Sequence, residues 1–485
     1  MKFHILIYGC QMNYSDSARI KVRLQNLGWQ YCTSIDEADV VIFDTCSVRQ
    51  KAEDKISGIL KDIPKSKKIW ITGCMIQHDL NPGKFFWMKW QKFKKWNFLP
   101  ETNENPQIIW LQKISEKEKI YLNSKQELSD YVFVNYAYIP LFTTFIKKFP
   151  NLELLFRIDD LHHLPEILTK LGYDVSVNDK KLQNYISIIP DNPNFAFTDS
   201  SKTAFVPIQT GCSKFCSYCI VPFARWLEKN RNTEEILEEV KSHLKNWKTE
   251  IILVWQIVNK HKDFLNILKS ILKLDWLKRL RYTSPYPTYY SDEIFALHEN
   301  EQKLCPQIHI PLQSGSDEIL KKMNRWYSSE QFKSFISKLQ NLKRDISITT
   351  DIIVWFPNET DEDFKKTLDL VEYSKFDMIY IWLYSSRPLT LADKLYKDNI
   401  SSQIKEKRRN MLNDLLLKIS SKNNQKEVGK IKDILITNIQ NWIWMWYDEK
   451  LKNFIVRDVD DESLNNFVKA EVIHAEALKL EAKRI

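Results

Sequence analysis

Short apolar runs alternate with amphipathic stretches along most of the chain. Near the start, apolar residues at 3–8, 40–43 and 69–72 are separated by polar segments, and residues 16–27 have a helical pattern. Such an alternation of strand and helix is typical of an α/β unit with a parallel sheet. We therefore predict a small domain of this class at the beginning of the chain.

The same alternation returns in the middle of the chain and ends before a segment of different character. A charged helix is predicted at 403–425, and residues 429–485 carry short alternating strands that favour a small β-barrel. Between the two outer regions, strand-like runs alternate with amphipathic helices, as in a β/α barrel. These runs lie at 205–208, 251–254, 308–312, 346–354 and 378–383.

Residues 79–150 are unlike the rest, because they are rich in Lys, Trp and Phe and have no clear period. Aromatic side chains among lysines can stack on nucleic-acid bases, but biased segments of this kind are more often solvated loops. We interpret the segment as an insertion. The predicted domains are then residues 1–200, which include it, followed by 201–427 and 428–485.

Composition narrows the class of protein. A chain of 485 residues is long enough for several domains, and 44% hydrophobic with 27% charged residues is typical of a globular protein. There is no apolar run of about 18 residues, so no membrane helix is expected, and the apolar start is too short for a signal peptide. We therefore expect a cytoplasmic protein. The net charge of +9 is compatible with a polyanionic partner without indicating one.

Three cysteines form a dense motif after the strand predicted at 205–208. Cys212, Cys216 and Cys219 have the spacing C-x3-C-x2-C, and thiolates suit iron–sulfur clusters or zinc. Structural zinc sites usually have four ligands in paired spacings, and no second pair lies near. Three ligands on a four-iron cluster leave one iron open to a substrate, so we favour a cluster over zinc.

This loop resembles the signature of the radical S-adenosylmethionine (SAM) superfamily, C-x3-C-x-aromatic-C, at the end of the first barrel strand. The resemblance implies that the open iron binds the methionine part of SAM, and that reductive cleavage of SAM gives a 5′-deoxyadenosyl radical. Tyr218 would then lie beside the adenine. An ordinary loop aromatic is almost as good an interpretation of this tyrosine.

Three further cysteines, Cys10, Cys46 and Cys74, each follow a predicted strand of the N-terminal unit. Ligands gather at the carboxyl ends of parallel strands, so we expect the three thiols to converge. Their surroundings resemble the three cysteine motifs of the methylthiotransferases, which implies a second four-iron cluster facing the first across a shared cavity. Cys32 and Cys305 are interpreted as structural thiols. The matching motifs are Tyr8-Gly9-Cys10-Gln11-Met12-Asn13, Thr45-Cys46-Ser47-Val48-Arg49 and Thr72-Gly73-Cys74-Met75.

Within that family, the residues around Cys10 and Cys46 are similar to the branch that methylthiolates N6-isopentenyladenosine next to the tRNA anticodon. The resemblance implies two [4Fe-4S] clusters, SAM, the anticodon stem-loop of tRNA as substrate, a flavodoxin or ferredoxin as electron donor, and a monomer. It also implies a Rossmann-like N-terminal domain, a radical SAM partial barrel and a TRAM-like C-terminal barrel. The residues expected to contact SAM besides Tyr218 are Gln256, Ser284, His309, Gln313 and Asp351.

Two other functions stay open on the sequence. One is a sister methylthiotransferase that acts on threonylcarbamoyladenosine in tRNA or on a ribosomal protein. The other is a non-enzymatic zinc or RNA-binding module. The segment 429–485 has 9 basic and 10 acidic residues and hence no net field for RNA, so the basic helix at 405–409 or the insertion is the better candidate for phosphate contact.

Glycine is depleted and tryptophan enriched. The chain has 9 glycines and 16 tryptophans, whereas an average of about 7% predicts roughly 34 glycines. Trp226, Trp255, Trp326 and Trp355 stand where the family has glycine, which serves for close approach or positive φ. An indole there would cost several kcal/mol. We hypothesise that the gene uses UGA for glycine, with further cases among Trp70, Trp247 and 442–446. Other departures from the family are Asp44, Ile257 and Tyr286.

Overall fold

The computed structural model divides into two compact units. The first comprises Met1–Pro190 with Ile220–Leu227, and the second comprises Asp191–Cys219 with Glu228–Ile485. The insertion predicted at 79–150, Trp226 and Trp442 lie outside the described residues. The residues that the structure describes are 1–46, 56, 58–76, 151–175, 202–225, 228–387, 390–398, 401–440 and 443–485.

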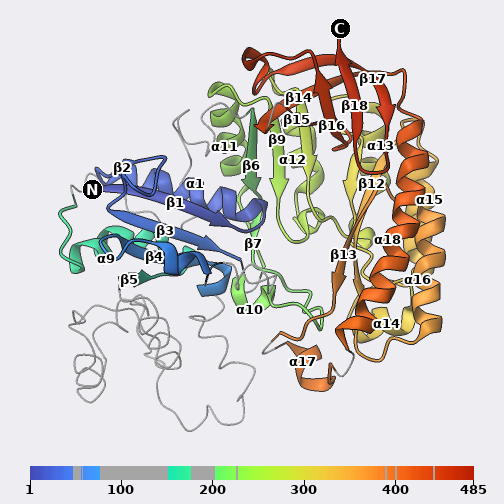
Figure 1. Cartoon of the computed structure of the whole chain (residues 1–485), viewed down its shortest axis with the longest axis horizontal. Helices are drawn as coiled ribbons and strands as arrows, with labels where there is room; N and C mark the ends of the chain where they lie inside the picture. Colours follow the sequence, from blue (N-terminus) through green and yellow to red (C-terminus); the bar gives the residue numbers. More distant parts are fainter. Residues whose placement is uncertain are drawn as a thin grey trace. The chain divides into compact units, whose positions relative to one another are not determined.

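A parallel sheet of five strands organises the first unit, as predicted (Figure 1). The strand order is β2-β1-β3-β4-β5, so the direction of progression reverses at β1. In open sheets of this order, ligands bind at the carboxyl ends of the strands on either side of the reversal. The strands are β1 (Lys2–Tyr8), β2 (Gln30–Tyr31), β3 (Val40–Thr45), β4 (Lys68–Gly73) and β5 (Leu152–Leu155).

The start of one helix and the presence of one strand in this unit differ from the prediction. Helix α1 (Gln11–Asn26) begins five residues before the expected start, because the Cys10 N–H donates to Asn13 Oδ1 at 3.0 Å and starts the helix on polar residues without an apolar period. Strand β5 lies in a region where no strand was predicted. Its four residues are too few for a period to identify. The 3-10 helix η1 (Ile158–His163) and the helix α9 (Leu164–Lys170) follow this strand.

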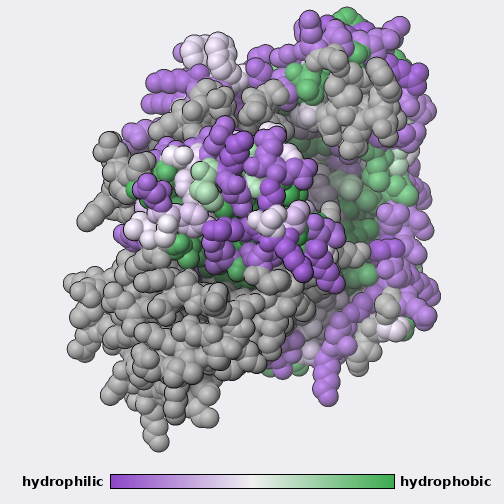
Figure 2. Space-filling view, turned by 60° about the vertical axis from the view of Figure 1, so that its left-hand side comes forward, coloured by the Kyte–Doolittle hydropathy of each residue, from purple (hydrophilic) through white to green (hydrophobic). Residues whose placement is uncertain are grey.

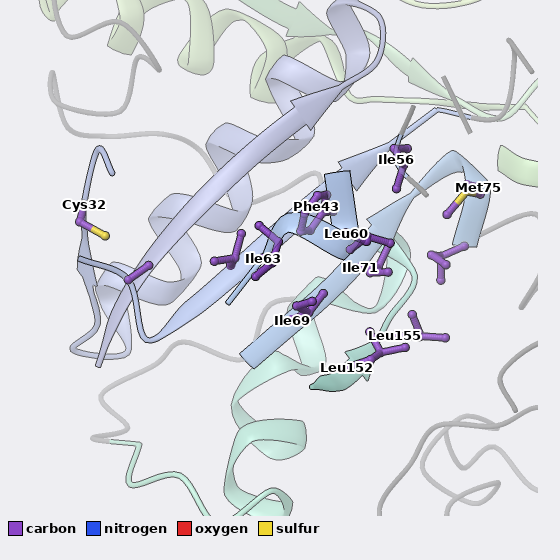
Figure 3. Packing of buried hydrophobic residues seen from close by; sticks show 13 residues of the cluster. Cys32, Phe43, Ile56, Leu60, Ile63, Ile69, Ile71, Met75, Leu152 and Leu155 are labelled. Atoms are coloured by element: carbon purple, nitrogen blue, oxygen red, sulfur yellow. The ribbon is translucent and has the colours of Figure 1, made fainter. Parts of the chain in front are cut away.

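The core of the first unit packs around β3, β4 and β5 (Figure 3). All six positions of β3 are buried, as expected of a central parallel strand covered on both faces. Cys32 belongs to this cluster and its Sγ donates to the Phe3 carbonyl at 3.3 Å, which agrees with a structural thiol. Other members of the cluster are Ala38, Val41, Phe43, Ile56, Leu60, Ile63, Ile69, Ile71, Met75, Ile76, Leu152 and Leu155.

The second unit contains two parallel three-stranded sheets, in the orders β10-β9-β6 and β11-β12-β13. An isolated parallel bridge between Leu280 and Leu304 connects β10 with the segment that leads into β11. The predicted runs are all strands, and β10 is an additional one. The strands are β6 (Thr203–Pro207), β9 (Glu250–Val254), β10 (Arg279–Tyr282), β11 (Gln307–His309), β12 (Ser347–Val354) and β13 (Met378–Leu383).

Helices follow these strands in turn, and local capping explains where several begin (Figure 1). In α15 the Ser328 hydroxyl and the Gln331 side chain form a capping box, and Thr360 and Asp363 do the same for α16. Asn232 accepts from the Glu234 N–H at the start of α11. The helices are α11 (Thr233–Lys245), α12 (Phe264–Leu272), α13 (Asp292–Asn300), α14 (Asp317–Lys322), α15 (Ser329–Gln340), α16 (Asp361–Ser374) and α17 (Leu391–Leu395).

The long helix α18 (Ser402–Gln425) leads to a closed five-stranded barrel in the order β14-β15-β16-β18-β17. The barrel is fixed to the rest of the second unit through buried polar groups. Arg281 donates to the carbonyl of Asp448 at 2.7 Å and to Glu250 Oε1 at 2.8 Å, and Tyr447 donates to Glu250 Oε2 at 2.7 Å. The strands are β14 (Ile431–Gln440), β15 (Ile443–Tyr447), β16 (Asn453–Arg457), β17 (Phe467–Ala475) and β18 (Leu480–Arg484).

The coloured part of the face in Figure 2 is mostly hydrophilic, with hydrophobic residues exposed between the polar ones. This distribution is ordinary for a folded chain whose apolar side chains form internal cores. Among the described helices, none is long and apolar enough to span a membrane.

Candidate iron–sulfur sites

The three N-terminal cysteines lie at one edge of the five-stranded sheet. Cys46 and Cys74 directly follow β3 and β4, and Cys10 comes two residues after the last residue of β1. The strand register puts Tyr8 beside Thr45 and Thr45 beside Gly73, so these strands end at the same level. The parallel sheet therefore brings together thiols that are far apart in sequence, as predicted.

The thiols of this trio are close enough to influence one another. Burial raises the pKa of Cys74 well above its usual range, and the charges of Cys46 and Cys10 raise it further. A metal-bound thiol is deprotonated by the metal's charge, which offsets this penalty. In the described part of the chain, no three His, Cys, Asp or Glu side chains are grouped as they are around a single metal ion. A four-iron cluster distributes its cysteine ligands over several iron atoms, so its ligands are spread more widely.

A buried polar network braces the ends of β1 and β3. Asn13 donates from Nδ2 to Asp44 Oδ1 at 2.7 Å and to the Thr45 carbonyl at 3.1 Å, while Ser17 donates to Asp44 Oδ2 at 2.7 Å. Burial and the nearby charge of Asp16 raise the pKa of Asp44. The sequence departs from the family at Asp44, and the structure gives both carboxylate oxygens of that residue a donor.

Two glycines allow this close arrangement. A Cβ on Gly9 would lie 1.9 Å from Asn13 Oδ1, and a Cβ on Gly73 would lie 2.3 Å from the Thr45 carbonyl oxygen. Gly73 also has φ +93°, a conformation that side chains with a Cβ disfavour. Each glycine directly precedes a cysteine of the trio. The two glycines thus let Asn13 and the Thr45 backbone pack closely beside Cys10 and Cys74. The donor set at this edge, three thiols, suits an iron–sulfur cluster held by thiolates.

An arginine that the sequence analysis did not select completes this site. Arg225, the last residue of α10 (Val221–Arg225), donates from Nε to Cys74 Sγ at 3.1 Å and from Nη2 to Asp16 Oδ2 at 2.5 Å. Although α10 follows Cys219 directly in the chain, it belongs to the first unit. The only signal in the sequence was its place between the cysteine loop and Trp226.

The second trio lies in the loop after β6 and the short strand β7 (Gln209–Thr210). Cys212 is buried, whereas Cys216 and Cys219 are partly exposed. The Cys219 N–H donates to the Cys216 carbonyl at 2.9 Å and tightens the loop. Burial raises the pKa of Cys212 to about 11, and the neighbouring Cys216 thiolate contributes to the shift. A bound metal would favour the thiolate form of Cys212, as it would for Cys74.

The end of α14 holds this loop in place. Ser217 donates its N–H to the Met323 carbonyl at 2.9 Å, and Asn324, with φ 56°, donates from Nδ2 to the Phe215 carbonyl at 2.9 Å. Arg325 approaches Cys216 Sγ with Nη1 at 3.6 Å. Three successive residues of one turn therefore fix the cysteine loop from outside.

Tyr218 lies between two of these cysteines in the sequence and packs against a buried hydrophobic cluster. Burial and the charge of Cys216 raise the pKa of its hydroxyl well above the usual range, so the side chain is neutral. A neutral aromatic at this place is compatible with the expected adenine contact, which stays a prediction. The cluster comprises Ile319, Met323, Ile353, Phe356, Tyr384 and Ala392.

Two of the residues expected to contact SAM bind each other. His309 at the end of β11 contacts Asp351 Oδ2 through Nε2 at 3.0 Å and Thr349 Oγ1 through Nδ1 at 3.0 Å. Trp382 donates from Nε1 to Asp351 Oδ1 at 2.9 Å. The imidazole and the carboxylate are therefore held in fixed orientations by neighbouring strands.

The other expected SAM contacts lie beyond strand ends, and two of them have strained backbones. Gln313 has φ 71° and Ser284 has φ 48°, and Gln256 follows β9 by two residues. Residues with a Cβ rarely adopt this conformation, and such strain clusters at functional sites. The Gln313 N–H donates to the Asp351 carbonyl at 2.8 Å, so the structure brings Gln313 to the His309 pair. Contact of any of these residues with SAM stays a prediction.

Comparison with solved structures shows the class of the fold. The chain superimposes with a TM-score of 0.51 and 11% identity on a radical S-adenosylmethionine methyltransferase, TsrM, from Kitasatospora setae, solved with tryptophan substrate and a SAM analog. The match covers 81% of this chain and 75% of the other. Residues 206–371 match the model of the radical SAM superfamily, and residues 2–82 match the uncharacterized protein family UPF0004. The fold is therefore that of the radical SAM enzymes.

Sequence relatives narrow the class. The chain is 33% identical over its full length to a tRNA-2-methylthio-N(6)-dimethylallyladenosine synthase of Clostridium botulinum (strain Langeland / NCTC 10281 / Type F), of which it covers 97%. It is 32% identical over 95% of its length to the protein of that name from Thermoanaerobacter sp. (strain X514), of which it covers 88%. The chain belongs to the family of tRNA-2-methylthio-N(6)-dimethylallyladenosine synthases.

Proposed function

We propose that this protein attaches a methylthio group to the adenine of N6-isopentenyladenosine, the dimethylallyl nucleoside of the relatives' name, next to the anticodon of tRNA. One observation carries the proposal. Two separate cysteine trios, each at the ends of parallel strands, occur in a chain related over its full length to synthases of this reaction. A single cysteine trio would suit many radical SAM enzymes. Two trios suit a transferase that must also supply or position the sulfur of the methylthio group.

Each trio has a distinct role in the proposal. Cys212, Cys216 and Cys219 would hold one [4Fe-4S] cluster, and a second cluster would bind the N-terminal trio, Cys10, Cys46 and Cys74. When bound, the first cluster and SAM supply a radical that activates the adenine carbon, and SAM also supplies the methyl group.

The chain's own residues orient the reactants. The turn after α14 keeps the loop of the second trio in one conformation through hydrogen bonds to Phe215 and Ser217. His309 on β11 and Asp351 on β12 form a polar pair, which would bind the polar parts of SAM. Tyr218 would stack on the adenine of SAM. Fixed donors and acceptors of this kind reduce the entropy lost when reactants are positioned.

Further features belong to the same proposal. The first unit is Rossmann-like and the strands β6 and β9 to β13 form a partial barrel, while the C-terminal barrel is TRAM-like and binds RNA. The domains are 1–200, 201–427 and 428–485. The anticodon loop must splay its target base from the stack, as base-modifying enzymes require. A flavodoxin or ferredoxin donates the electron, and the protein acts as a cytoplasmic monomer.

Anaerobic reconstitution with iron and sulfide tests the cluster assignment. We expect about eight iron atoms per chain, because each trio holds one four-iron unit, together with reductive cleavage of SAM. A chain that binds zinc instead, gives no brown colour and leaves SAM intact would contradict the proposal and favour a zinc or RNA-binding module.

Expression in a bacterial strain that lacks its own methylthiotransferase tests the substrate. Mass spectrometry of digested tRNA is expected to show the 2-methylthio derivative of N6-isopentenyladenosine. Methylthiolation of threonylcarbamoyladenosine or of a ribosomal protein, with isopentenyladenosine unchanged, would assign the chain to a sister reaction.

A further inference from the structure

Arg225 is buried beside the N-terminal trio. Cluster binding by the three cysteines does not by itself explain why an arginine is buried there. Its side chain is 3% exposed and its partner Asp16 is fully buried. Nε donates to Cys74 Sγ at 3.1 Å, while Nη2 binds the Asp16 carboxylate at 2.5 Å. The guanidinium is therefore oriented from one side by a carboxylate and directed at a cysteine sulfur on the other.

Stability alone is a weak reason for this arrangement. Removing two charges from water costs several kcal/mol per ion, and a buried ion pair is often no more stable than well-packed apolar residues. A buried cation near several thiolates has a different advantage. A cluster held by three thiolates carries negative charge, and hydrogen bonds to its sulfurs together with nearby charge determine its reduction potential.

We propose that Arg225 is a positioning residue for the N-terminal cluster. Its Nε–H orients the Cys74 sulfur, its positive charge balances the thiolates of Cys10, Cys46 and Cys74, and Asp16 fixes the guanidinium plane. The inference rests on the proposed function only in assigning a cluster to this trio. It concerns the binding and the potential of that cluster, so it does not depend on which nucleoside is modified.

The test uses the full-length chain with Cys212, Cys216 and Cys219 changed to Ala, so that only the N-terminal trio can hold iron. Arg225→Gln and Arg225→Lys are compared in this background after anaerobic reconstitution. Arg23→Gln is the matched control, because Arg23 is also buried in the first unit and donates to the His162 carbonyl at 2.8 Å, in the last turn of α1 and 13 positions after Cys10. Iron per chain and the midpoint potential from electron paramagnetic resonance are measured.

Arg225→Gln is expected to lose iron several-fold faster to a chelator and to shift the midpoint potential of the remaining cluster to more negative values. The shift is negative because removal of a nearby positive charge makes reduction of the cluster less favourable. Arg225→Lys is expected to keep the midpoint potential closer to that of the parent, because the positive charge remains. It is expected to hold its iron less well than the parent, because an ammonium lacks the planar fork that reaches Asp16 and Cys74 together. Arg23→Gln is expected to change neither.

Unchanged potential and retention in Arg225→Gln, or equal changes in Arg23→Gln, would overturn the assignment. If the parent with three alanines binds no iron, the cluster assignment of the proposed function fails instead. If it binds about four iron atoms per chain and Arg225→Gln behaves like it, only the role of Arg225 is lost.

A separate observation concerns three tryptophans whose backbones suit glycine. Trp247, Trp276 and Trp355 have φ 65°, 64° and 60°. Only a few per cent of residues other than glycine have positive φ, and bulky ones are outliers there. Ten tryptophans lie in the described residues, so three of ten far exceeds that frequency.

The surroundings of two of these tryptophans give no packing reason for an indole. Trp247 occupies the residue after the C-cap of α11, where its N–H donates to the Leu244 carbonyl and the Lys248 N–H donates to the His243 carbonyl. This is the Schellman motif, in which glycine is usual. The side chains of Trp247 and Trp276 are 77% and 70% exposed, so burial does not offset the strained backbone.

We infer that glycine is the native residue at Trp247, Trp276 and Trp355, and that UGA codons there were read as tryptophan. Trp276 extends the hypothesis drawn from the sequence, which did not include it. Trp70 shows no such sign, because it is buried in β4 without a positive φ and donates from Nε1 to Glu153 at 2.8 Å.

The nucleotide sequence and the native protein together test this inference. We expect UGA at these three positions and UGG at Trp29, which is buried and packs on Trp70 with ring centroids 5.3 Å apart. Peptide masses from the source organism should show glycine at 247 and 276. UGG codons with tryptophan masses would overturn the inference. In the recombinant chain, Trp247→Gly is expected to raise the melting temperature and Trp29→Gly to lower it.

Discussion

The two cysteine trios contain the same number of thiols but are assembled in different ways. Cys10 and Cys74 are 64 positions apart, and the sheet register brings them to one edge. Cys212 and Cys219 span only eight residues, and a single loop presents all three ligands. The first site therefore depends on correct folding of a whole domain, whereas the second depends on local sequence and on the turn that anchors it.

The arginine beside each trio repeats this difference. Arg225 donates to Cys74 Sγ and to the Asp16 carboxylate, and both contacts are buried. Arg325 approaches Cys216 among aromatic rings, with its guanidinium 4.7 Å from the Tyr286 ring centroid. Both sites thus place a cation beside a cysteine sulfur, one fixed by a carboxylate and the other by aromatic stacking. The two arginines thus share a cysteine contact but differ in the groups that hold them.

The largest effect is expected from Cys216→Ala in the second trio. Loss of one of its three ligands should abolish both SAM cleavage and methylthio transfer, and reduce iron from about eight to about four atoms per chain. Anaerobic assays of 5′-deoxyadenosine and of modified nucleosides measure both outcomes. Cys305→Ala, in which a buried thiol outside both trios is changed, should keep all the iron. Retained SAM cleavage in Cys216→Ala would break the assignment of the second trio.

Cys74→Ala should have a narrower effect. Methylthio transfer is expected to fall to background and iron to about four atoms per chain, while SAM cleavage continues because the other trio is intact. The same two assays separate these outcomes. Transfer at the parent rate would show that the N-terminal trio has no part in the reaction.

Gly73→Ala should disturb the first site through its backbone. A Cβ would meet the Thr45 carbonyl at 2.3 Å and strain a residue with φ +93°, which predicts a loss of about 2–4 kcal/mol from the free energy of unfolding and weaker iron binding at this trio. Gly172→Ala is the control in the same unit, because Gly172 has φ +82° but no atom within 4 Å of a Cβ. Its cost should be about 1 kcal/mol. Equal losses in the two variants, measured by denaturant unfolding, would show that the close packing near Cys74 is unimportant.

The smallest effect concerns the pH dependence of stability in the second unit and involves His298, a residue outside both trios. Burial lowers the pKa of His298 to about 3, below the value of about 6.5 in an unfolded chain. The unfolded state alone gains a proton as pH falls below 6.5, so folding stability decreases, by about 1.4 kcal/mol for each pH unit once pH is well below that value. The loss continues toward pH 3. The stability lost between pH 7 and pH 5 should be smaller in His298→Gln than in the parent, and an identical loss would contradict the prediction.

The sequence by itself determined the features that repeat over short distances. The alternation of apolar and polar positions predicted the parallel strands β1, β3 and β4, the central strands and the long helix α18, because side-chain periods of 2 and 3.6 residues are local properties. The C-x3-C-x2-C spacing identified the second trio for the same reason. Placing a cysteine after each of three predicted strands was enough to anticipate the first trio.

Only the tertiary structure decided the contacts that join distant residues. Arg225 reaches Cys74 across 151 positions, β5 pairs with β4 across a long intervening segment, and Asn13 binds Asp44 across 31 positions. A period or a motif records what a residue does with its near neighbours, whereas these pairings depend on which surfaces the folded sheet brings together.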